Sequence, residues 1–93
     1  MELMVKDFAG SFAENKDVAK EIRVNCIEKN FDKEKVIILN FKSVDSTTQS
    51  FVHALISRVF QKQGEYALDK LEFKNCNKPV KSLITTVINY SLE

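Results

Sequence analysis

Four hydroxyl side chains and one carboxylate lie within six consecutive positions, 45–50, where the sequence reads DSTTQS. This stretch separates the apolar run VIILNF from a segment with helical periodicity. Hydroxyls at the start of a helix can cap its free N–H groups, and a phosphate added there would suit the positive end of the helix dipole. Ser46, three positions before Gln49, has the spacing of a capping box, although Asp45 or Thr47 could cap the helix instead.

A second polar segment, FKNCNKP, comes between the last expected strand and the last expected helix. Its asparagines would most simply cap their own turn. If all strands run parallel, however, both polar segments lie at the same edge of the sheet, where open α/β sheets place their ligands. We therefore expect one composite surface, called the rim here, that could bind a partner. The rim comprises Asp45, Ser46, Thr47, Thr48, Gln49, Ser50, Asn75 and Asn77.

Little else in the sequence suggests catalysis. His53 is the only histidine, and its position opposite the apolar stripe of its helix predicts an exposed side chain. It follows Ser50 by three positions, but no neighbour orients the two as a nucleophile and a base. No His, Cys, Asp and Glu spacing matches a metal site, and the two glycines stand alone. We expect no catalytic residue, metal or cofactor; the alternative left open is an enzyme or small-ligand-binding protein that uses the rim from Asp45 to Ser50.

The composition predicts one soluble domain over residues 1–93, because a chain of 93 residues is too short for two cores. Its 14 basic and 13 acidic side chains are interleaved, so electrostatics does not favour nucleic acid as a partner. The N-terminal MELMVKDF lacks the pattern of a signal peptide, and no apolar run approaches the ~20 residues that span a bilayer. We expect a cytoplasmic protein without membrane contact, in which Cys26 and Cys76 are free thiols.

Hydrophobic periodicity predicts strands that alternate with helices. The run KVIILNF is short, β-branched and nearly uncharged, which is typical of a central parallel strand covered on both faces. Val36, Ile38 and Leu39 should then be almost fully buried. The expected fold class is α/β, with a small, mostly parallel β-sheet covered by helices in the order β-α-β-α-β-α. The strands are expected at 2–8, 35–41 and 68–75, and the helices from about residues 15, 48 and 79. Six phenylalanines are expected in or against the core: Phe12, Phe31, Phe41, Phe51, Phe60 and Phe73.

Order and spacing over most of the chain resemble a known family. An apolar strand ends in Asn and Phe, a V-x-x-x-x-x-S-F step leads into a helix, and F-x-N-x-N precedes the last helix. In these features the chain resembles the STAS-like domain family of uncharacterised function, which is similar in pattern to the STAS anti-sigma factor antagonists. The matching residues are Asn40, Phe41, Val44, Ser50, Phe51, Phe73, Asn75 and Asn77.

The resemblance implies a STAS-like fold and a non-enzymatic role as a protein-interaction or regulatory module. STAS antagonists bind a histidine-kinase-like ATPase, which phosphorylates a Ser or Thr in the pattern D-S-[ST]-G. Carried onto this chain, the possible phosphorylation sites are Thr47 and the preceding Ser46. The glycine of that pattern is replaced here by Thr48. A third reading of the sequence is a structural subunit that forms a homodimer.

Overall fold

The computed structural model describes the whole chain, Met1–Glu93. Its three main strands are β1 (Glu2–Met4), β3 (Ile37–Asn40) and β5 (Leu71–Lys74). They form a parallel sheet in the order β1-β3-β5, so the run VIILNF supplies the middle strand, as predicted. Leu3, Leu39 and Phe73 lie in register across the three strands. The mixed architecture with parallel pairing confirms the predicted α/β class.

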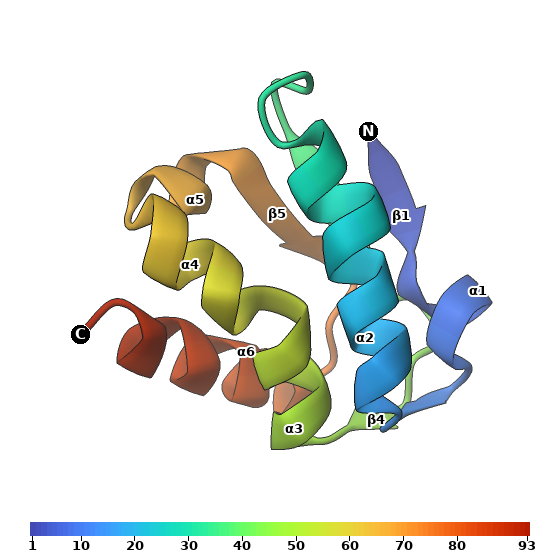
Figure 1. Ribbon diagram of the computed structural model, residues 1–93. Coiled ribbons are helices and arrows are strands. Elements are labelled where there is room, and N and C mark those ends of the chain that lie inside the picture. The colour runs from blue at the N-terminus through green and yellow to red at the C-terminus, as the bar shows by residue number, and fades with distance from the viewer.

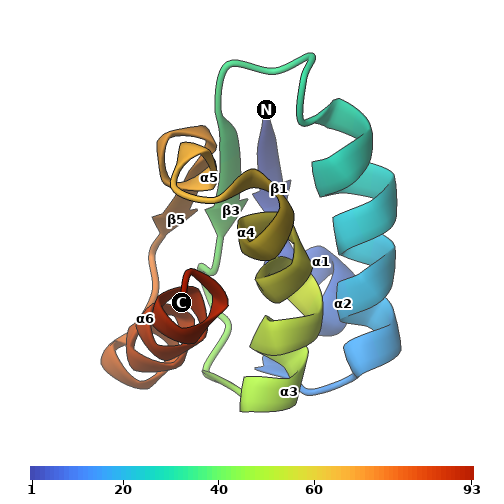
Figure 2. The ribbon, with the colours of Figure 1, turned by 60° about the vertical axis from the view of Figure 1, so that its left-hand side comes forward.

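Three long helical segments accompany the sheet. They are α2 (Lys16–Ile22) with its π-helical continuation η1 (Arg23–Glu28), then α3 (Gln49–Val52) with η2 (His53–Ser57) and α4 (Arg58–Gln63), and finally α6 (Lys78–Ser91). The segment from α3 to α4 runs beside α2, and both lie on the same side of β1 and β3 (Figures 1 and 2). None of these helices combines the length and the apolar character that crossing a bilayer requires.

The central strand is buried on one face and open on the other. Leu39 points toward the helices and is fully buried, whereas Val36 and Ile38 are only half-buried. Ile38 lies in register between Glu2 and Glu72, which are both exposed. The prediction that both faces of this strand are covered is therefore wrong. Helices pack on a single face, and the charged neighbours on the edge strands shield Ile38 only in part.

Four short elements complete the fold: α1 (Val5–Ala9), β2 (Phe12–Ala13), β4 (Ser46–Thr47) and α5 (Tyr66–Lys70). The strands expected at 2–8 and 68–75 are shorter than predicted, because part of each range is helical. Gly10 ends α1: its N–H donates to the Lys6 carbonyl at 2.8 Å, and its φ of 77° lies in the left-handed region that glycine tolerates best. The chain then enters β2, which forms a separate parallel pair with β4.

One hydrophobic core of 22 buried residues lies between the helices and the sheet. Phe41, Phe51 and Phe60 are its largest fully buried side chains, as expected from the sequence. The expectation for Phe12 is wrong, because 51% of its surface is exposed. It sits in the two-residue strand β2 at the margin of the fold, where its neighbour Ala13 takes the buried position instead.

A buried arginine links the helical segment that follows β2 to the helical segment that follows β4. Arg23 is 7% exposed, and its Nη1 donates a hydrogen bond to the Ala54 carbonyl at 3.0 Å. Its Nε lies 3.4 Å from a carboxylate oxygen of Glu28 in the same helical segment. Because Ala54 lies in η2, this contact couples the α2 segment directly to the α3 segment.

Candidate functional site

The hydroxyl-rich stretch is held in place by backbone hydrogen bonds to β2 and to Ser11, the residue before it. The N–H groups of Asp45 and Ser46 donate to the Ser11 carbonyl at 2.8 and 3.3 Å, and the N–H of Thr48 donates to the Ala13 carbonyl at 3.3 Å. These bonds keep the chain extended through β4. Helix α3 therefore begins only at Gln49, after Ser46 and Thr47 have paired with β2.

Thr48 caps this helix. Its Oγ1 accepts a hydrogen bond from the Phe51 N–H at 3.1 Å, and its backbone is extended, as the N-cap position requires. The predicted capping box of Ser46 and Gln49 is wrong, because Ser46 is still part of β4 and Gln49 is already the first helical residue. The tertiary pairing of β4 with β2 moves the cap two residues along the chain, from the predicted Ser46 to Thr48.

The two hydroxyls considered for phosphorylation have different surroundings. Thr47 Oγ1 donates a hydrogen bond to the Ala13 carbonyl at 2.6 Å, and the side chain is half-buried. Ser46 is exposed, and it lies in register with exposed Phe12 of β2. An incoming group therefore reaches Ser46 directly, whereas it must break an internal hydrogen bond to use Thr47.

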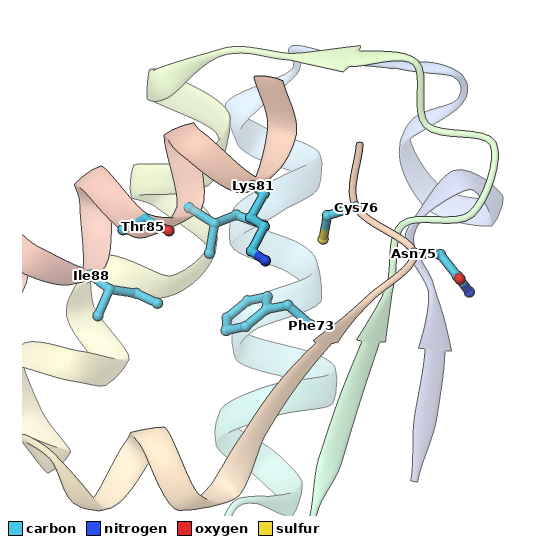
Figure 3. A pocket seen from close by; sticks show the side chains of 7 residues that line it. Phe73, Asn75, Cys76, Lys81, Thr85 and Ile88 are labelled. Atoms are coloured by element: carbon cyan, nitrogen blue, oxygen red, sulfur yellow. The ribbon is translucent and has the colours of Figure 1, made fainter. Parts of the chain in front are cut away.

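The side chains of the two rim asparagines, Asn75 and Asn77, have different hydrogen-bond partners. Asn77 caps α6 through its Oδ1, which accepts from the Val80 N–H at 2.9 Å, and its Nδ2 donates to the Asp45 carbonyl at 2.8 Å. It thus joins the two polar segments, as the composite surface requires. Asn75, with a left-handed φ of 57°, donates from Nδ2 to Asn40 Oδ1 at 3.1 Å. Its side chain points away from α6 (Figure 3), so it does not extend the surface around Asn77.

Asn40 is a polar centre that the sequence analysis did not single out as a site. It is 8% exposed; its Nδ2 donates to Glu2 Oε2 at 2.8 Å, and its Oδ1 accepts from the Lys42 N–H at 2.9 Å and from Asn75. The signal was present in VIILNF, where Asn40 is the one polar residue. Its hydrogen bonds link the C-terminal end of β3 to the first residue of β1 and to the residue that follows β5.

Beside the rim, a hollow of about 500 Å³ opens along α3 and is lined by Lys16, Ser50, His53 and Tyr90 among others. His53 is exposed, as predicted, and its Nδ1 lies 2.8 Å from the Tyr90 hydroxyl oxygen. The two rings are stacked with centroids 5.7 Å apart. His53 is thus oriented by Tyr90, and no hydrogen bond links it to Ser50, so the hollow does not display a paired nucleophile and base.

A second cavity, of about 400 Å³, lies between β5 and α6 (Figure 3). Cys76 borders it, and partial burial raises the pKa of this thiol, while the positive charge of Lys81 opposes that shift. Both Cys76 and Cys26 are free thiols, as predicted. No three His, Cys, Asp or Glu side chains gather in a way that could hold a metal ion.

Comparison with known proteins agrees with this architecture. The family described as a STAS-like domain of unknown function matches residues 18–81, which is more than half of the chain and spans the region from α2 to the start of α6. No curated protein and no solved structure matches the chain significantly. The matched region contains β3, the hydroxyl-rich stretch and both asparagines of the rim. The chain therefore belongs to the family of STAS-like domains of unknown function.

Proposed function

We propose that the protein is a non-enzymatic, cytoplasmic interaction module that docks another protein on the rim, and that a hydroxyl of the rim regulates the docking. The observation that carries this proposal is the position of Phe12 beside Ser46 in the β2–β4 pair. Phe12 is 51% exposed, although the core buries four of the other phenylalanines expected there: Phe31, Phe41, Phe51 and Phe60. Exposed aromatic rings beside small polar side chains are common anchors of protein interfaces.

The surface around Phe12 is suited to docking because it is built before the partner arrives. Backbone bonds from Asp45 to Ser11 and the side-chain bond from Asn77 to Asp45 hold the two polar segments together. A preformed surface loses less conformational entropy on binding than a mobile loop would. Phe12 and the adjacent rim together provide an apolar anchor with a polar border, which is the usual arrangement of interfaces.

Ser46 is the hydroxyl best placed to regulate this contact. It is exposed next to Phe12, whereas Thr47 donates its hydroxyl hydrogen to Ala13. A phosphate would add about two negative charges beside the aromatic ring. A partner that covers Phe12 would have to remove water from this phosphate, and that cost would weaken its binding. The resemblance to STAS antagonists suggests a histidine-kinase-like ATPase as the partner.

The binding test compares Phe12→Ser with the matched control Leu68→Ser. Leu68 is 47% exposed on α5, at the opposite end of the molecule from β4 (Figures 1 and 2). Histidine-kinase-like ATPases of the source organism would be purified and titrated against each variant by calorimetry. We expect Phe12→Ser to weaken binding by about tenfold or more, and Leu68→Ser to leave it unchanged. Equal effects of the two variants would contradict docking on the rim, and no binding to the wild type would reject the ATPase as partner.

The regulatory part is tested with Ser46→Glu and Ser46→Gln, which have similar size but differ in charge. If charge at this position blocks docking, Ser46→Glu loses affinity while Ser46→Gln retains most of it. Incubating the wild-type protein with the ATPase and ATP, followed by mass spectrometry of the tryptic peptides, shows whether Ser46 or Thr47 is modified. Unaltered affinity of Ser46→Glu would leave a docking surface that is not regulated at this residue.

A further inference from the structure

The sheet has an open edge beside β5. This strand pairs with β3 alone, so its other side has no neighbouring strand. The Lys74 carbonyl accepts from the Phe41 N–H at 2.8 Å, which shows that the backbone of Lys74 faces β3. Because successive residues of a strand face opposite sides, the N–H and C=O of Phe73 face outward. No turn, loop or side-chain hydrogen bond uses either group. An edge of this kind is a template for another strand.

The cavity between β5 and α6 lies directly along this edge (Figure 3). Its apolar walls are the ring of Phe73 and the side chains of Ile84 and Ile88 on α6. Helix α6 packs mainly on the α3–α4 segment, so the space next to β5 is not filled by its neighbours. If a strand were added to β5, every second side chain would point to the helical side of the sheet and enter this cavity.

The charge of the cavity indicates what kind of strand would fit. Among the lining side chains Lys81 is the only charged one, and no acidic residue lines the cavity. Lys81 forms no salt bridge, and it extends from α6 toward the ring of Phe73 (Figure 3). Cys76 lines the same cavity. An incoming carboxylate would give Lys81 the partner that the chain itself does not supply.

We propose that the groove between β5 and α6 binds an extended segment of another protein, which adds to β5 as a fourth strand and directs a carboxylate side chain to Lys81. β5 has four residues, so the contact spans about 13 Å, or four to six residues of the segment. The main-chain bonds to Phe73 supply affinity, and the cavity selects apolar and acidic side chains. This surface is separate from the rim, and the inference does not depend on the proposed function.

Two other occupants fit the observations less well. A second copy that paired through the same edge would bring another Lys81 to the groove side of the joined sheet and no acid, leaving both cations unmatched. A small carboxylate could reach Lys81, but it would not use the outward N–H and C=O of Phe73. An extended acidic segment satisfies both features.

The test begins with a random-peptide library displayed on phage and selected on the purified protein. We expect enriched peptides that alternate apolar residues and contain Asp or Glu. A selected peptide is then synthesised, and its affinity is measured for the wild type, for Lys81→Glu and for the control Lys20→Glu. Lys20 is an exposed lysine of α2, remote from the groove. Lys81→Glu should weaken binding by about tenfold or more, and Lys20→Glu should not. Melting curves establish that both variants are folded.

Two further measurements identify the mode of binding. N-methylation of alternate residues of the peptide should abolish binding at one set of positions and spare the other, as strand pairing requires. Bound peptide should slow alkylation of Cys76 in the groove, whereas Cys26 in η1 serves as the internal control.

Several outcomes would overturn the inference. It fails if no peptide is enriched, if enriched peptides lack acids, or if Lys81→Glu binds them as well as the wild type does. Protection of Cys76 by simple carboxylates such as butyrate, equal to that by the peptide, would assign the groove to small ligands. Protection that rises with protein concentration in the absence of peptide would assign it to a second copy.

Discussion

Replacing Thr48 by alanine tests how the hydroxyl-rich stretch works. Thr48 Oγ1 accepts from the Phe51 N–H at 3.1 Å, so the Thr48→Ala variant leaves that helix N–H without its cap. Loss of such a cap costs about 0.5–2 kcal/mol of the free energy of unfolding. For a domain of this size, each kcal/mol lowers Tm by about 4–8 °C. Ser46→Ala should change the stability by less than about 0.5 kcal/mol, because Ser46 is exposed and does not cap the helix.

The assay is urea denaturation followed by circular dichroism, with Tm measured in parallel. Thr48→Ser keeps the capping oxygen and controls for loss of the methyl group, so it should recover most of the stability. If Ser46→Ala costs as much as Thr48→Ala, the helix is capped from Ser46 and the geometry described above is incorrect. If neither variant loses stability, capping is not what these hydroxyls contribute.

Three further predictions concern the core and the cysteines. Leu39→Ala should lower the free energy of unfolding by about 2–5 kcal/mol, because Leu39 is fully buried. Ile38→Ala should lower it clearly less, because Ile38 lies on the open face of the sheet and is only half-buried. Urea denaturation measures both values, and equal losses would mean that something covers that face. Titration of the unreduced, denatured protein should count two thiols, and a count of zero would contradict free Cys26 and Cys76. The pKa of Cys76 is raised in the folded state, so its contribution to stability is fully present below the ordinary thiol pKa and is lost as the pH rises through the raised value. Over that alkaline range the stability of Cys76→Ser should therefore decline less than that of the wild type. An identical decline in the two proteins would mean that Cys76 does not cause the pH dependence.

Local sequence was sufficient to determine the order of the main elements and several of their ends. The run VIILNF becomes the central strand, because a short β-branched segment without charges is stable only when strands flank it. Asn15 caps α2, and Gly64, with a φ of 63°, ends α4. Pro79 lies in the first turn of α6, where its missing N–H costs nothing. These features depend on neighbours within a few residues, so the sequence displays them directly.

Other features were decided by contacts between segments far apart in the chain. Thr48 rather than Ser46 became the cap, because β4 pairs with β2 and keeps the intervening residues extended. Asn75 turned away from the rim, because Asn40 offered it a hydrogen-bond acceptor on the sheet. Ile38 is only half-buried because helices cover one face of the sheet and not the other, although its sequence neighbours suggested full burial.

The surfaces on which the two proposals rest were also decided by contacts between distant segments. Phe12 is exposed because a two-residue strand at the margin of the fold buries only one of its side chains, whereas hydrophobicity alone had assigned Phe12 to the core. The open edge of β5 exists because the sheet ends there, which no residue of β5 specifies. Residue types and spacing therefore determined the fold class and the place of the hydroxyls, whereas long-range pairing decided which side chains remain available to a partner.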